Sequence, residues 1–345
     1  MRSSYLCVAL LVSGFASVGC GRVDEPNCGV GGCGETSPAT TTQPAPNAPG
    51  PPGASGSSCT VVPKGLVERG PAAPTLLAPV LRTISVALDA DSVYFGTLES
   101  DLRGTVYVVA KAGGAARKLA DVAAYDLHVV SGRVFAGGGG GKLVAFDRDG
   151  SNASTLVERD VFDFDVDPAG DIYWSDLTRG IFRTSRDGQT TTTLAQGEST
   201  QGVSLHGGWV YWAEYAKGRI MRVAQGGGRS DVVYETDGYV RSVAFDCAHV
   251  FVSIGNYGDA TVALELDEAG PNRTLPFVGV GGEMAIDTAS LYVVSNESAT
   301  RVSLASGETT RLGDGPRSPG ITGKIAADDD AIYWTSQAGV MRAAK

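Results

Sequence analysis

An aromatic residue within a short apolar pair returns at a nearly constant interval along most of this chain. Tyr94 and Tyr333 are 239 positions apart over six intervals, which gives a period of about 40 residues. That period is the length of a four-stranded β-propeller blade, and it predicts a ring of similar sheets. The seven marked pairs are Tyr94-Phe95, Phe135-Ala136, Tyr173-Trp174, Tyr211-Trp212, Phe251-Val252, Tyr292-Val293 and Tyr333-Trp334.

The third unit shows the strands of one blade most clearly. Alternating apolar residues predict strands at Phe162–Val166, Asp171–Trp174, Ile181–Thr184 and Thr191–Ala195, with a tight turn at Asp187-Gly188. The other units repeat this order, and none has the apolar period of a helix. Glycine makes up 47 of the 345 residues, about twice its usual share, as many tight turns require.

Closure of the ring can be predicted from the two ends of the repeat region. The last unit stops at Lys345 after its third strand, and an unpaired sheet edge favours aggregation. The segment Pro74–Pro79 resembles the outer strands of other units, so we expect it to pair with Val340–Ala343. The predicted fold is therefore all-β: a seven-bladed β-propeller of four-stranded antiparallel blades, closed by an N-terminal strand. Six blades are the alternative, if one degenerate unit packs outside the ring.

Three units carry a more specific signature. The third reads Asp171-Ile172-Tyr173-Trp174-Ser175-Asp176, and the fourth and seventh contain Tyr211-Trp212-Ala213 and Tyr333-Trp334-Thr335. These segments resemble the YWTD repeat of lipoprotein-receptor propellers, and more distantly the TolB-like and NHL-like propeller superfamilies. The resemblance implies a propeller fold. Receptor propellers of this kind usually have six blades and bind proteins or act in pH-dependent release.

The N-terminus has the features of an export signal. Arg2 is followed by the apolar run Tyr5–Ala16, which is too short to span a bilayer, so residues 1–19 are expected to be removed. The next segment, Ser17-Val18-Gly19-Cys20, resembles the lipobox of bacterial lipoproteins, although that family usually has Leu where Ser17 stands. The resemblance implies lipidation of Cys20 and anchoring to a membrane of the bacterial cell envelope, with the outer membrane favoured. Ordinary signal cleavage with release is the alternative.

The segment after the signal predicts a tether and a disulfide framework. Residues 20–58 are rich in Gly, Pro, Ser and Thr and too poor in large apolar residues to fold, which leaves 59–345 for the propeller. An even number of cysteines in an exported chain suggests two disulfides. The four are Cys28, Cys33, Cys59 and Cys247, and three pairings are open, among them Cys28 with Cys33 and Cys59 with Cys247.

Composition and motifs exclude several functions. The chain has 28 Lys and Arg against 38 Asp and Glu, a net charge of −10, so nucleic acid is not an expected partner. The sequence has no nucleophile elbow and no His-Glu-x-x-His pair, so no motif supports a serine-hydrolase or a zinc-hydrolase mechanism. We expect a monomer without a cofactor.

The innermost strand of each blade borders the central channel, so its polar positions are the candidate site. Aligning these strands gives two channel-facing positions, one at the mouth and one a step deeper. The mouth residues are Ser85, Asp126, Asp163, Gly202, Ser242, Glu283 and Lys324. The deeper residues are Ala87, His128, Asp165, Ser204, Ala244, Ala285 and Ala326.

Two interpretations of the channel residues remain open. Asp126, His128, Asp163 and Asp165 can form an acidic spot that attracts a divalent cation, with Glu283 across the channel and Lys324 as counter-charge. This set would serve a hydrolase or a lyase. Alternatively, the carboxylates bind water or backbone amides around a hydrated channel. The second interpretation favours a non-enzymatic binding or scaffold module.

The loops at the mouth offer aromatic side chains for such binding. Aromatic rings supply large, rigid contact surfaces for a protein or a glycan. The predicted function is therefore a cell-envelope lipoprotein whose propeller binds a protein or glycan on its loop face. The candidate binding residues are Tyr125, Phe162, Tyr215, Tyr239, Tyr257, Glu283 and Lys324.

Overall fold

The computed structural model describes residues 73–99, 103–246, 249–254, 260–265, 282–317 and 323–345. All of these lie in one compact unit, Gly50–Lys345. The predicted export signal, tether and disulfides lie outside the described residues, as do Cys20 and Tyr257. Within the described part of the chain, no helix has the length and apolar character needed to cross a membrane.

Seven antiparallel sheets account for the strands of the described residues. The first three are β2–β5 (Thr83–Leu88, Ser92–Thr97, Val106–Ala110, Arg117–Ala120), β6–β9 (Asp126–Val130, Arg133–Gly137, Gly141–Asp147, Ser154–Val161) and β10–β13 (Asp163–Val166, Ile172–Asp176, Gly180–Thr184, Thr191–Gln196). The next three are β14–β17 (Thr200–His206, Trp209–Glu214, Arg219–Ala224, Asp231–Glu235), β18–β20 (Val240–Phe245, His249–Ile254, Ala260–Glu265) and β21–β24 (Glu283–Ile286, Ser290–Val294, Ser298–Ser303, Thr309–Asp314). The last combines β1 (Thr75–Ala78) with β25–β27 (Ile325–Ala327, Ala331–Ser336, Gly339–Ala344).

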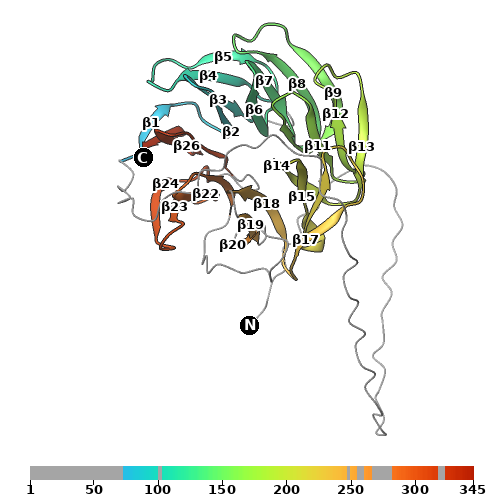
Figure 1. Cartoon of the computed structure of the whole chain (residues 1–345). Coiled ribbons are helices and arrows are strands. Elements are labelled where there is room, and N and C mark those ends of the chain that lie inside the picture. Colours follow the sequence, from blue (N-terminus) through green and yellow to red (C-terminus); the bar gives the residue numbers. More distant parts are fainter. Residues whose placement is uncertain (1–72, 100–102, 247–248, 255–259, 266–281, 318–322) are drawn as a thin grey trace, which may run out of the picture. The chain divides into compact units, whose positions relative to one another are not determined.

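The sheets are arranged around a common centre (Figure 1). Their innermost strands contact one another in the order β2, β6, β10, β14, β18, β21 and β25, and β25 contacts β2 again. This arrangement confirms an all-β propeller of antiparallel blades. Six of the sheets have four strands. Six is also the number of blades in the alternative prediction. The prediction of seven four-stranded blades is not met in the described residues, because β18–β20 has three strands there.

The predicted N-terminal closure is confirmed. Strand β1 is the outer strand of the sheet formed by β25, β26 and β27, and it runs antiparallel to β27. Thr75 lies opposite Arg342, and Ala78 lies opposite Val340. The segment from the start of the repeat region therefore covers the edge that the last unit would otherwise expose.

The repeated aromatic residues form the cores between neighbouring sheets. Tyr94, Tyr173 and Tyr333 are each 1% exposed. Tyr94 packs with Leu127 and Phe146 of the next sheet. Burying a large apolar side chain stabilises a fold by about 1.5 to 3 kcal/mol, so these repeated cores hold adjacent blades together.

The face of the propeller opposite the channel mouth is fixed by aspartates in the turns between the first and second strands. Asp89 is an example: its Oδ1 accepts hydrogen bonds from the backbone N–H groups of Asp91 and Ser92, at 2.9 and 2.8 Å. Its Oδ2 accepts one from the Tyr94 hydroxyl at 2.7 Å and pairs with Arg148 of the next sheet. These contacts define a structural role for this face.

Candidate functional site

The channel contains two connected cavities at its mouth and below it. The outer cavity has a volume of about 270 Å³ and the inner one about 190 Å³. Both are lined by residues from the polar positions of the innermost strands. The two cavities share Asp126, Asp163, Gly202, Glu283 and Lys324.

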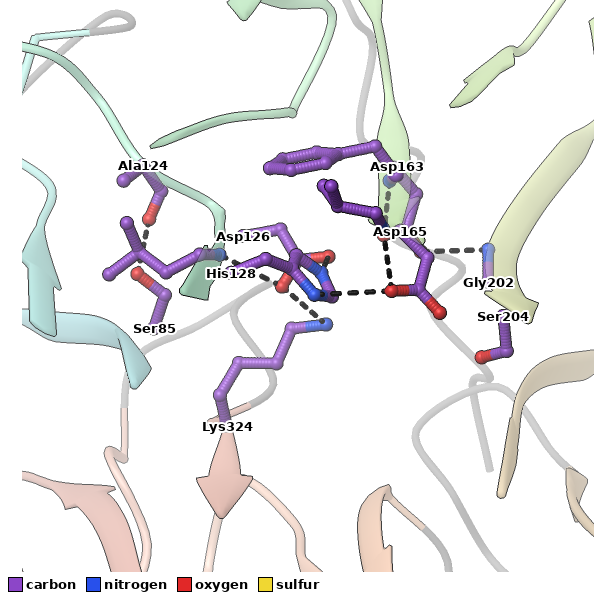
Figure 2. A network of polar contacts seen from close by, with 12 residues as sticks. Ser85, Ala124, Asp126, His128, Asp163, Asp165, Gly202, Ser204 and Lys324 are labelled. Atoms are coloured by element: carbon purple, nitrogen blue, oxygen red, sulfur yellow. Dashed lines mark hydrogen bonds and ion pairs between the residues drawn. The ribbon is translucent and has the colours of Figure 1, made fainter. Parts of the chain in front are cut away.

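Lys324 carries the positive charge at the centre of the mouth (Figure 2). Its ammonium Nζ lies 3.2 Å from Glu283 Oε2 and 3.6 Å from Asp126 Oδ1, so it links three different sheets. Burial disfavours the charged lysine, but the surrounding carboxylates outweigh this effect and hold the pKa of Lys324 well above its usual value. These contacts favour the charged form of Lys324.

His128 bridges two of the carboxylates one step deeper. Its Nδ1 lies 3.2 Å from Asp165 Oδ1, and its Nε2 lies 3.5 Å from Asp126 Oδ2 (Figure 2). The ring also packs against Phe164, with 5.0 Å between ring centroids. Burial lowers the pKa of His128, but Asp126 and Asp165 more than reverse this and raise it to about 9.

The two aspartates of β10 are bound to the backbone of the next sheet. Gly202 N–H donates to Asp163 Oδ2 at 2.8 Å, and Leu205 N–H donates to Asp165 Oδ2 at 2.9 Å. Burial and the nearby Asp126 raise the pKa of Asp163, whereas Lys324 and His128 overcome burial and lower the pKa of Asp126.

Serines complete the ties between neighbouring sheets around the channel. Ser85 Oγ donates to the Ala124 carbonyl at 2.6 Å, and Ser242 Oγ donates to the Gly282 carbonyl at 3.0 Å. The predicted polar residues of blades two and three, Glu283 and Lys324 line the two cavities, and several of them tie neighbouring sheets together. This geometry matches the alternative in which the carboxylates bind backbone amides. The deeper alanines predicted to face the channel pack instead in the apolar clusters between sheets; they are Ala87, Ala244, Ala285 and Ala326.

The arrangement leaves little room for a metal ion at the mouth. The Lys324 ammonium already occupies the position between Asp126 and Glu283 that a cation would take. In the part of the chain that the structure describes, no group of three or more His, Cys, Asp or Glu residues is arranged to hold a metal.

Aromatic and polar side chains form the rim of the outer cavity. Tyr125 and Phe162, both predicted, line it together with Gln201 and Arg241, which the sequence analysis missed. The Tyr125 ring lies against Gly139, where an added Cβ would come within 2.5 Å of Tyr125 Cδ2. Gly139 N–H also donates to the Phe162 carbonyl at 2.8 Å, so one glycine turn supports both aromatic residues.

Gln201 and Arg241, which were not predicted, share a position relative to the mouth residues with the rest of the rim. Each rim residue immediately precedes the mouth residue of its strand. Extending the strand alignment by one position would therefore have found the rim, which is formed by Ile84, Tyr125, Phe162, Gln201 and Arg241.

Tyr215 and Tyr239 form a second aromatic group beside the rim. Their rings stack with centroids 4.7 Å apart, and the Arg241 guanidinium carbon lies 5.9 Å from the Tyr215 ring centroid. Tyr239 is 41% exposed and borders a separate cavity with Lys217 and Asp237. The four described aromatic candidates therefore belong to two adjacent groups rather than one pocket.

The ring of sheets and its polar channel define the protein as a β-propeller. No protein-family model matches the chain, and no curated protein matches it. The crystal structure of the computationally designed Ika8 protein is similar at a TM-score of 0.55 and 10% identity, covering 80% of this chain and 99% of that one. A chain of the crystal structure of the nidogen/laminin complex matches at a TM-score of 0.45 and 18% identity, covering 55% of this chain and 77% of that one. At 10% identity the likeness to the designed protein is one of fold alone.

The His128 bridge predicts how stability depends on pH. Its folded pKa of about 9 exceeds the ordinary 6.5, so its contribution is complete below pH 6.5 and is lost as pH rises through about 9. We expect His128→Asn to lower the free energy of unfolding by about 2 kcal/mol at the acidic end of this window, with the difference from wild type shrinking at the alkaline end. Urea denaturation of both proteins across this pH range measures the effect. A constant difference would contradict a charged His128.

Proposed function

We propose that this protein is a non-enzymatic binding or scaffold module of the bacterial cell envelope. In this proposal Cys20 carries the lipid anchor, residues 20–58 form the tether, and the loop face of the propeller binds a protein or a glycan. The rim of the outer cavity supports the binding role, because aromatic rings and hydrogen-bonding groups converge there on one opening.

The internal bonding of the channel supports binding over catalysis. Asp163 and Asp165 accept hydrogen bonds from backbone amides of the next sheet, and Asp126 faces His128 and Lys324. A general acid or base must reach a substrate proton, and these groups are engaged in holding the blades together. Tyr125 and Gln201 at the rim are better placed to contact a ligand.

We infer further that β18–β20 belongs to a seventh blade. Its inner strand β18 lies between β14 and β21 in the ring, the place that one unit of the repeat predicts. Residues 266–281, which follow β20 and precede β21, lie outside the described part of the chain.

A capture experiment tests the binding proposal. Purified protein should retain a specific envelope protein or glycan, and the variant Tyr125→Ala with Arg241→Ala should lose most of that retention, since both contacts border the opening. The matched control is Gln189→Leu, which changes an exposed residue in a turn on the opposite face. Equal capture by the rim variant and the control would contradict a rim site.

The alternative is a hydrolase or lyase that uses Asp126, His128, Asp163 and Asp165. The opposite directions of the two pKa shifts favour it, because two neighbouring carboxyls whose surroundings raise the pKa of Asp163 and lower that of Asp126 can act as acid and base. A rise of the melting temperature with Ca²⁺, Mg²⁺ or Zn²⁺ that Asp163→Ala abolishes would support this alternative.

A further inference from the structure

The outer cavity combines three features that select the chemistry of its ligand. These are flat aromatic surfaces, a mixture of hydrogen-bond donors and acceptors, and paired charges of both signs. We propose that the channel mouth is a saccharide-binding site for an uncharged sugar residue, an inference that rests on the proposed binding function and narrows it to one ligand class.

The aromatic part of the cavity suits the apolar face of a sugar ring. Tyr125 and Phe162 border the same opening, and both are half-buried. The glycine turn at Gly139 holds Tyr125 in place and leaves no space for a larger residue behind its ring. Such a fixed ring loses little conformational entropy when a ligand stacks on it.

The polar part of the cavity suits sugar hydroxyls, which donate and accept hydrogen bonds. The Gln201 side chain borders the opening and makes no hydrogen bond to any described residue, so its amide is available as both donor and acceptor. Glu283 adds carboxylate acceptors, and the Lys324 ammonium adds donors. The volume of about 270 Å³ limits the buried part of the ligand to a small group such as one sugar ring.

The charges of the cavity favour an uncharged ligand. Lys324 is paired with Glu283 and Asp126, and Arg241 lies on the same rim. A ligand ammonium would compete with Lys324 for its carboxylates, and a ligand carboxylate would face Asp126 and Glu283. A charged ligand group, whether ammonium or carboxylate, would leave a partly buried charge of the cavity without its partner. A sugar hydroxyl can bind to Lys324 or to a carboxylate without separating that pair.

Titration of the full chain with free sugars tests the inference. Probes are neutral hexoses and N-acetylhexosamines, each compared with its amino-sugar and uronic-acid counterpart, and binding is followed by calorimetry and saturation-transfer NMR. At least one neutral sugar should saturate the protein, and its two charged counterparts should bind about tenfold more weakly.

Two rim variants and one control locate the site. Tyr125→Ala and Gln201→Leu should each weaken sugar binding about tenfold, as expected for loss of a stacking ring or of hydrogen bonds to the ligand. Gln189→Leu removes an exposed amide from the opposite face and should leave binding unchanged. Because Gln201→Leu keeps the size of the side chain, it remains informative if Tyr125→Ala disturbs the fold.

Three results would overturn the saccharide site. They are failure of every neutral sugar to saturate the protein, tighter binding of a charged counterpart, and sugar binding that neither rim variant weakens. If a protein partner is still captured and lost with the rim variants, the proposed binding function stands and only the ligand class is wrong. If neither sugar nor partner binding responds to the rim, both fail.

Discussion

Lys324→Met is expected to lower the free energy of unfolding by about 3 kcal/mol, one of the largest effects of a single substitution in this protein. The change removes the ammonium that lies 3.2 Å from Glu283 and 3.6 Å from Asp126 and leaves these carboxylates without their shared cation. Breaking a buried ion pair costs about 3 to 5 kcal/mol, and access to channel water places this one at the lower end. Urea denaturation at neutral pH measures the loss.

Two further variants separate charge from packing. Lys324→Arg keeps the positive charge and should retain most of the stability. Glu283→Gln added to Lys324→Met should recover part of the loss, because it removes one of the stranded carboxylates. If Lys324→Met stays within about 0.5 kcal/mol of wild type, the cross-channel pairing does not stabilise the ring.

Gly339→Ala is the second substitution with a large expected effect. Gly339 begins β27 at a φ of +129°, and an added Cβ would lie 2.1 Å from the Ala78 carbonyl oxygen and 2.9 Å from the Val80 nitrogen. The methyl group must push β1 away from the edge that it covers. We expect a loss of about 3 kcal/mol or more, together with faster amide exchange of β27 residues.

Gly132→Ala is the matched control for this prediction. Gly132 also has a positive φ of +80°, but an added Cβ there would meet nothing within 4 Å. It should therefore cost only the backbone strain of about 1 kcal/mol. Thermal denaturation compares the two, and equal losses would show that the contact between Gly339 and β1 is unimportant.

The strands and the closure of the ring could be predicted from the sequence because the same physical requirement recurs in each unit. Tyr173 and its counterparts must be buried between sheets, so their spacing reports the positions of the second strands. The pairing of β1 with β27 could be predicted because the last unit has only three strands of its own, which would leave the edge of its sheet unpaired. The number of strands in the fifth sheet did not follow: β18–β20 has three strands, and residues 266–281 after β20 lie outside the described part of the chain.

The alternation of residues along the inner strands predicted which polar side chains face the channel, but it did not predict their partners. Period-two alternation placed Asp126 and Asp163 in the channel, but the partners of each group depend on how neighbouring blades are staggered. The hydrogen bond from Gly202 N–H to Asp163 and the contact between Lys324 and Asp126 both cross sheets. Gln201 was missed because it lies one residue before Gly202, where the aligned channel positions of its strand begin, and because it has no aromatic ring to mark it.

The pairing of β1 with β27 also sets the order in which the chain can reach its native state. Thr75 and Arg342 are 267 positions apart and share a hydrogen bond across this sheet. During synthesis β1 remains without its partner until β27 has been made. Strands so far apart in the sequence pair slowly, because the chain loses the entropy of closing a long loop before the stabilising contacts between the strands form. The pairing of β1 with β27 is therefore expected to form last, and until then the edge of β27 stays unpaired and open to pairing with another chain.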